Sequence, residues 1–80
     1  MITVYSKTKC PNCIQAKTLL ERKGIVFAEI NIEVDGNARA FLIEQGFRSV
    51  PQIFINGAVV AGGFQWLAQQ PQEYFDQLIA

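Results

Sequence analysis

Two cysteines set three positions apart carry the reactive chemistry of this sequence. Cys10 and Cys13 enclose Pro11 and Asn12, and the 80 residues include no further cysteine and no histidine. Residues three apart face the same side of a helix, so two thiols at this spacing can close a disulfide and reopen it. The pair is therefore a candidate site for thiol–disulfide exchange.

The position of Cys10 favours its ionised form. Pro11 suits the first turn of a helix, which the apolar spacing predicts over residues 11–23, with Gly24 as its stop. Cys10 then stands at or near the helix N-cap, where its sulfur faces backbone N–H groups that have no partner within the helix. We expect this environment to lower the pKa of the Cys10 thiol. Cys13 places a second sulfur one turn further on, within reach of the first.

Three other interpretations of the cysteine pair remain open. One is a structural disulfide, although a four-residue loop constrains the unfolded chain by only about 2 kcal/mol. Another is a metal site. Zn²⁺ requires four ligands, so a site within one chain is excluded, whereas two chains could share a metal ion or an iron–sulfur cluster in a dimer. The last is an inert interaction domain, which predicts a Cys10 no more reactive than a free thiol.

Composition and charge exclude several classes of protein. Seven Lys and Arg balance seven Asp and Glu, so no net field attracts nucleic acid or an anionic membrane. Half of the residues are hydrophobic, which supports one packed domain over residues 1–80 and argues against disorder. The longest apolar runs fall far below the roughly 20 residues of a membrane span, and the N-terminus lacks the apolar segment of a signal peptide. We expect a cytoplasmic monomer.

Apolar periodicity and turn residues predict an α/β fold with the order βαβαββα. The expected elements are a strand at 2–5, a helix at 11–23, a strand at 26–32, a helix at 38–45, strands at 52–55 and 58–60, and a helix at 64–79 that Pro71 interrupts. Asn56 and Gly57 favour positive φ and predict a hairpin between the last two strands. Strands separated by a helix are expected to pair in parallel through right-handed crossovers. The predicted fold is a four-stranded mixed sheet with three flanking helices.

Three local patterns refine this scheme. The apolar start of the 26–32 segment predicts a strand that is covered on both faces. Residues 35–37, Asp-Gly-Asn, are typical of a turn, so the second helix is expected to begin at Ala38. The loop Ser49-Val50-Pro51 precedes a strand and can offer unpaired backbone N–H and C=O groups to an extended peptide.

The cysteine segment and the proline loop together resemble a known family. Residues 5–13 (YSKTKCPNC), 49–57 (SVPQIFING) and the Gly62-Gly63 pair closely resemble the glutaredoxin family, over nearly the whole chain. The resemblance implies the thioredoxin fold, with Cys10 as the nucleophile, Cys13 as the resolving thiol and Pro51 as a cis-proline beside them.

The same resemblance implies a substrate groove. Lys7, the backbone of Val50 and the pair Gly62-Gly63 would line a site for glutathione, the expected reducing co-substrate. Asn12 and Ser49 adjoin these residues and are expected to contact substrate. Arg39 and Arg48 are interpreted as ordinary surface charges. No bound cofactor is expected.

Two positions depart from the glutaredoxin pattern. Asn12 stands where glutaredoxins usually have Tyr or Phe, and Phe64 or Gln65 stands where they have an acidic residue that meets the amino-acid end of glutathione. Both departures favour a resemblance to the NrdH-redoxins, which are glutaredoxin-like carriers. That alternative implies electron transfer to ribonucleotide reductase and recharging by thioredoxin reductase, with Phe64 and Trp66 as an apolar contact for the reductase.

Overall fold

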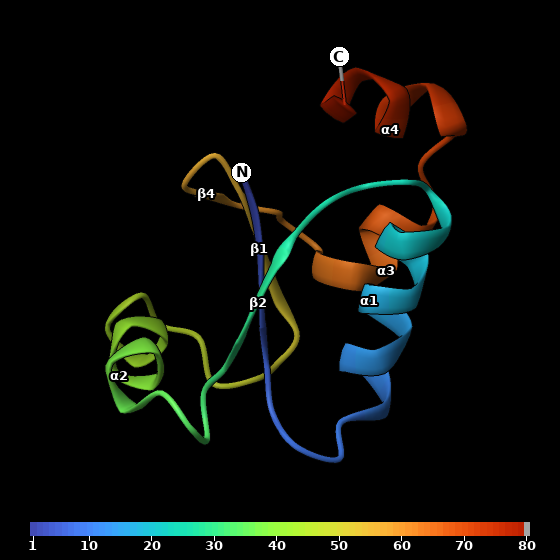
Figure 1. The fold of residues 1–80 in the computed structure, drawn as a ribbon. Helices are drawn as coiled ribbons and strands as arrows, with labels where there is room; N and C mark the ends of the chain where they lie inside the picture. The colour runs from blue at the N-terminus through green and yellow to red at the C-terminus, as the bar shows by residue number, and fades with distance from the viewer. Residues whose placement is uncertain (80) are drawn as a thin grey trace.

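A four-stranded mixed sheet forms the centre of the molecule (Figure 1). The computed structural model describes residues 1–79. The strands are β1 (Ile2–Ser6), β2 (Ala28–Asn31), β3 (Gln52–Ile55) and β4 (Ala58–Val59), in the spatial order β2-β1-β3-β4. β1 pairs in parallel with β2 and antiparallel with β3, and β3 pairs antiparallel with β4. The α/β fold with a mixed sheet is as predicted.

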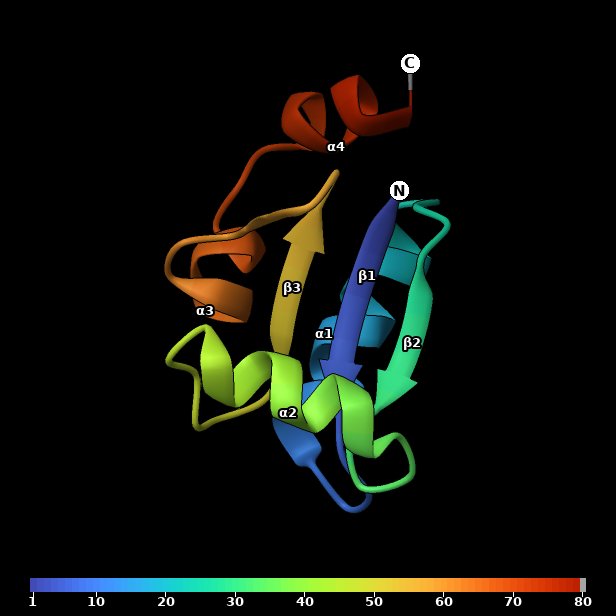
Figure 2. The same ribbon diagram turned by 90° about the vertical axis from the view of Figure 1, so that its left-hand side faces the viewer.

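Helices surround this sheet (Figures 1 and 2). They are α1 (Pro11–Arg22), α2 (Gly36–Glu44), α3 (Gly63–Ala68) and α4 (Gln72–Ile79). Figure 1 shows α1 and α3 on one side of the strands and α2 on the other, with α4 beyond the ends of the strands. The three flanking helices of the prediction become four, because the break at Pro71 separates the last segment into α3 and α4.

Backbone angles confirm the predicted turns. Gly24 follows the end of α1 with φ +73°, a left-handed conformation that stops the helix. Asn56 and Gly57 have φ +50° and +86°, so they form the tight hairpin between β3 and β4.

The second strand differs from its prediction. It begins at Ala28 instead of residue 26, and Val26 is 91% exposed. Ala28 and Glu29 are exposed as well, so the strand is not covered on both faces. The reason is its place in the sheet. β2 pairs only with β1 and is an edge strand, which the apolar start of the segment did not reveal.

The expected parallel pairing holds for β1 and β2 but is wrong for β3. β2 lies on the far side of β1, and β3 runs antiparallel to β1 on its other side. α2 crosses one face of the sheet between β2 and β3 (Figure 2). The connection through α2 therefore leads into a strand that runs antiparallel to β1 and β2, and it does not form a second parallel crossover.

The second helix begins earlier than residue 38. Asp35 is its N-cap residue, and the Asp35 Oδ1 accepts a hydrogen bond of 3.0 Å from the Ala38 backbone N–H. The predicted turn at residues 35–37 is therefore the start of α2, since the same polar residues that favour turns also cap helices.

Alternate side chains of the central strands pack on opposite faces. Val4 and Ile53 are fully buried in the core, together with Leu20 of α1 and Leu67 of α3. On the α2 side, the ring of Phe54 lies 5.3 Å from that of Tyr5 and 5.7 Å from that of Phe41. The sheet is therefore packed on both faces, against α1 and α3 on one side and against α2 on the other. None of the helices within residues 1–79 combines the length and hydropathy that a membrane crossing requires.

Candidate active site

Cys10 is the N-cap residue of α1, as the sequence predicts. Its backbone is extended (φ −110°, ψ 102°), and Pro11 is the first residue of the helix. The Cys10 Sγ accepts a hydrogen bond of 3.2 Å from the backbone N–H of Cys13. A helix N-terminus also carries a positive partial charge. Both features favour negative charge on this sulfur.

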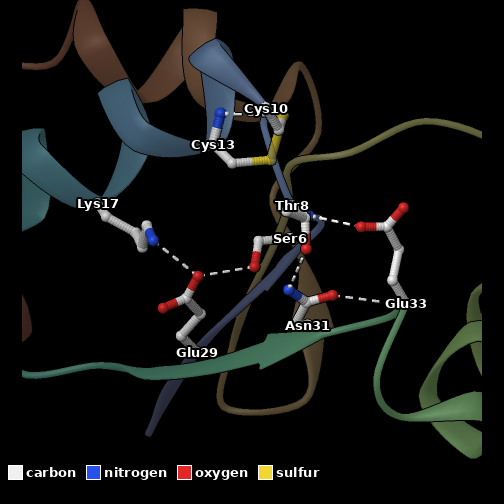
Figure 3. A network of polar contacts seen from close by, with 8 residues as sticks. All are labelled: Ser6, Thr8, Cys10, Cys13, Lys17, Glu29, Asn31 and Glu33. Carbon is white, nitrogen blue, oxygen red and sulfur yellow. Dashed lines mark hydrogen bonds and ion pairs between the residues drawn. A yellow bond between two sulfur atoms is a disulfide. The ribbon is translucent and has the colours of Figure 1, made fainter.

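The two cysteines form a disulfide in this structure (Figure 3). Their Cα atoms are 5.2 Å apart, within the ordinary range for a disulfide. Cys10 is 5% exposed and Cys13 is 1% exposed. Both cysteines are therefore buried, and Cys10 is the slightly more exposed residue.

The proline loop lies directly beside Cys10. The Cys10 Sγ is 4.0 Å from the carbonyl oxygen of Val50, and the Val50–Pro51 peptide bond is cis. The N–H of Val50 donates to no acceptor within residues 1–79. The loop therefore has an unpaired backbone donor close to the Cys10 sulfur.

A groove of about 690 Å³ runs along this loop. Its lining includes six of the residues singled out from the sequence: Asn12, Ser49, Val50, Pro51, Gly62 and Gly63. Phe64 and Gln65 border it too, beyond the glycine pair. No charged side chain borders the groove in the part of the chain that the structure describes. The groove brings together all the candidate binding residues except Lys7.

Lys7 borders a separate cavity of about 220 Å³. Arg39 of α2 and Arg48 line this cavity with Lys7, and Glu33 supplies its one carboxylate among residues 1–79. Both arginines are exposed, as expected of surface charges, and the fold places them beside Lys7. The position of Arg48 immediately before Ser49 could have indicated this, because the proline loop must lie close to Cys10.

A neighbouring cavity of about 200 Å³ connects these cations with the groove. Arg39 and Arg48 border it on one side, and Phe47 and Ser49 border both it and the groove. The groove next to Cys10 is therefore neutral, and the cavity that adjoins the groove is lined by positive charge.

The loop before Cys10 is fastened to the end of β2. The Thr8 backbone N–H donates to Glu33 Oε1 at 2.8 Å, and Asn31 Nδ2 donates to Thr8 Oγ1 at 3.2 Å (Figure 3). The backbone N–H of Glu33 donates in turn to Asn31 Oδ1 at 2.9 Å. The hydrogen bond from Thr8 is the main cause that lowers the pKa of the Glu33 carboxyl. Sequence patterns did not reveal this network, which joins segments about two dozen residues apart.

A second polar group lies on the inner side of the cysteine pair (Figure 3). Ser6, which is 1% exposed, donates from its hydroxyl to Glu29 Oε2 at 2.8 Å. Lys17 Nζ approaches the same oxygen at 2.7 Å. The hydrogen bond from Lys17, assisted by that from Ser6, lowers the pKa of the Glu29 carboxyl. This group links β1, β2 and α1 near the cysteine pair, and no sequence pattern indicated it.

Apolar side chains adjoin the groove near the glycine pair. Trp66 is 41% exposed, and its ring packs edge-on against Tyr74 with the centroids 5.4 Å apart. Phe64 is half-buried against the core. Residues 1–79 form no group of three or more His, Cys, Asp or Glu side chains that could hold a metal ion.

Comparison with known proteins places this geometry among redox proteins. The glutaredoxin family model matches residues 2–60. A probable glutaredoxin of Synechocystis is 37% identical over 81 residues, covering 99% of this chain and 74% of the relative. Two solved structures show the same fold.

One of these structures is a glutaredoxin-like protein and the other a glutaredoxin. The NrdH-redoxin of Escherichia coli superposes with a TM-score of 0.74 at 27% identity, covering 96% of this chain and 92% of the other. A buckwheat glutaredoxin in complex with glutathione superposes with a TM-score of 0.71 at 30% identity, covering 98% and 72%.

Proposed function

The chain belongs to the glutaredoxin family and has the thioredoxin fold, and we propose that it reduces protein disulfides or glutathione mixed disulfides through Cys10 and Cys13. The observation that carries the proposal is the 3.2 Å hydrogen bond from the Cys13 N–H to the Cys10 sulfur, at the N-terminus of α1. A thiolate is the reactive form in exchange, and this position stabilises it.

The reaction starts from the reduced pair. The Cys10 thiolate attacks one sulfur of a substrate disulfide, forms a mixed disulfide and releases the other sulfur as a thiolate, which takes up a proton from water. Cys13 then loses its proton and attacks the sulfur of Cys10, releasing the second substrate thiol. The substrate gains two electrons and two protons, and the protein is left with the disulfide seen in Figure 3.

Backbone groups of the proline loop are suited to align the substrate. The unpaired N–H of Val50 and its carbonyl, 4.0 Å from the Cys10 sulfur, can pair with a backbone that approaches in an extended conformation. Asn12 and the pair Gly62-Gly63 would form the other walls of this groove. Alignment matters because exchange requires the attacked sulfur to lie in line with the attacking one.

Glutathione is the co-substrate that the family membership favours, and the buckwheat relative was solved with it. Here its glycine carboxylate would lie toward Lys7, Arg39 and Arg48, which supply positive charge next to the groove. Its charged amino-acid end would reach Phe64 and Gln65, where the groove offers no charged partner within residues 1–79. Only one end of glutathione is therefore matched by charge.

The neutral end of the groove favours a second candidate function. A carrier that is recharged by thioredoxin reductase and donates electrons to ribonucleotide reductase needs no site for a free amino acid. The exposed Trp66 and the adjacent Phe64 would then contact the reductase. Either cycle requires a reducing compartment such as the cytoplasm, in which we place the protein as part of this proposal.

A comparison of reductants tests the proposal and separates its two versions. The oxidised protein is offered glutathione with glutathione reductase, or thioredoxin reductase alone, and NADPH consumption is followed with a protein disulfide as acceptor. Turnover with glutathione identifies a glutaredoxin, and turnover with thioredoxin reductase identifies a redoxin. Turnover with neither contradicts both versions. Colour or bound iron in a purified dimer would instead support a shared cluster between two cysteine pairs.

A further inference from the structure

A carboxylate lies among the cations beside the active site. Glu33 borders the cavity of about 220 Å³ that Lys7, Arg39 and Arg48 also line. None of these three cations forms an ion pair within residues 1–79. The cavity therefore combines three unpaired positive charges with one negative charge.

Hydrogen bonds hold this carboxylate in place. Glu33 Oε1 accepts the Thr8 backbone N–H at 2.8 Å, and the Glu33 N–H donates to Asn31 Oδ1 at 2.9 Å (Figure 3). The bond to Thr8 anchors one oxygen of the carboxylate, and no cation among residues 1–79 lies within ion-pair distance of Glu33. Its negative charge is thus held beside the three cations and shared among them.

The cavity adjoins the place where a substrate would bind. Arg39 and Arg48 line both this cavity and the neighbouring cavity of about 200 Å³. Ser49 lines that neighbouring cavity and also the groove along the proline loop. Charges act over about 10 Å at ordinary ionic strength. A substrate carboxylate near the reacting sulfur would consequently be attracted by three cations and repelled by Glu33.

We propose that Glu33 is a specificity-determining residue that weakens the binding of disulfide substrates with a carboxylate close to the reacting sulfur. Glu33 does not change the binding of neutral substrates. It therefore reduces the difference in affinity by which the site favours anionic substrates over neutral ones. This inference rests on the proposed function, because it concerns the substrates of the same cysteine pair.

Two matched peptides test the inference. Each is a short peptide ending in Cys-Gly with its cysteine joined to 2-thiopyridine, and the two differ only in a free or an amidated C-terminus. Reduced protein is mixed with increasing peptide, and release of pyridine-2-thione gives the single-turnover rate and the half-saturation concentration. Glu33→Gln removes the charge and keeps an acceptor for Thr8. Glu21→Gln, on the exposed side of α1, is the control for a change in net charge.

We expect Glu33→Gln to lower the half-saturation concentration for the free-carboxylate peptide about threefold, the size of effect that one unit charge produces in a largely aqueous medium. The amidated peptide should bind as before, and the difference should disappear at about 0.5 M salt, where charges are screened over a few ångströms. Glu21→Gln should leave the half-saturation concentration unchanged for both peptides.

Two results would overturn the inference. An equal change for both peptides would mean that Glu33 acts only on the shape of the loop, and an unchanged value for the free carboxylate would mean that its charge is not felt. In both cases the proposed function stands, because the peptides are still reduced. If the unaltered protein reduces neither peptide, the proposed function and the inference fail together.

Discussion

The backbone N–H of Cys13 points at the sulfur of Cys10 across 3.2 Å, while Cys13 itself is almost fully buried. This relationship gives the two sulfurs different environments. The Cys10 sulfur lies at the helix N-terminus beside the groove, and the Cys13 sulfur lies beneath the Cys10 sulfur, within the protein. The proposal that Cys10 is the attacking group and Cys13 the resolving group rests on that difference.

Replacement of each cysteine by serine should separate these roles. Cys10→Ser should abolish all exchange, because no thiolate then reaches the substrate. Cys13→Ser should accumulate a mixed disulfide on Cys10, since nothing displaces the bound substrate, and exchange with glutathione alone can continue. Mass spectrometry of each variant after incubation with a peptide disulfide measures the adduct. Equal inactivity in both, with no adduct on Cys13→Ser, would show that the assignment is wrong.

The Glu29 carboxyl should make stability depend on pH. Its pKa is lowered in the folded protein by Lys17 and Ser6, so its contribution is present above the unfolded value of 4.5 and is lost as the pH falls through the folded value. Lys17 and Glu29 are 27% and 38% exposed, so solvent screening limits the ion pair to below about 1 kcal/mol. Glu29→Gln should therefore lower the free energy of unfolding slightly at pH 7.

Urea unfolding of Glu29→Gln at two pH values measures this contribution. The deficit relative to the unaltered protein should shrink as the pH falls from 7 to 3, because the carboxyl loses its stabilising charge as the pH falls through its lowered folded pKa. Glu21→Gln, which lacks such partners within residues 1–79, is the control and should show little deficit at either pH. A deficit that persists undiminished at the lower pH would mean that the amide disturbs packing and that charge is not the cause.

Two glycines allow a matched test of close packing at the groove. Gly62 and Gly24 both have positive φ, +83° and +73°, so alanine at either site carries a backbone cost of about 1–2 kcal/mol. A Cβ at Gly62 would also lie 2.8 Å from the Trp66 Cβ, whereas at Gly24 it would meet nothing within 4 Å. Gly62→Ala should thus be clearly the more destabilising in thermal or urea unfolding. Equal losses would indicate that the start of α3 shifts freely.

The fold and the cysteine site were predictable where the determinants are local. Pro11 and Gly24 bound α1, and Asn56-Gly57 gives the hairpin, because each acts through its own backbone angles. The place of Cys10 at the helix start follows from the same local reasoning. The neighbouring proline loop was recognised from the resemblance to a family.

Features that depend on the packing of distant segments were not predictable. The Thr8 to Glu33 hydrogen bond and the cavity shared by Lys7 and Arg39 arise only once the end of β2 and α2 lie against the loop before Cys10. The edge position of β2 similarly depends on strand order, which apolar periodicity does not encode. Periodicity reports which face of an element is buried, and not which element covers it.

Alkylation of Cys10 as a function of pH tests the central claim most directly. Cys13→Ser is reacted with iodoacetamide, so that only the Cys10 sulfur is modified, and the rate is compared with that of a free cysteine peptide. Ionisation at the helix N-terminus predicts a rate that rises with a midpoint below about 7.5, against about 8.5 for the peptide. A midpoint at or above that of the peptide would contradict the account.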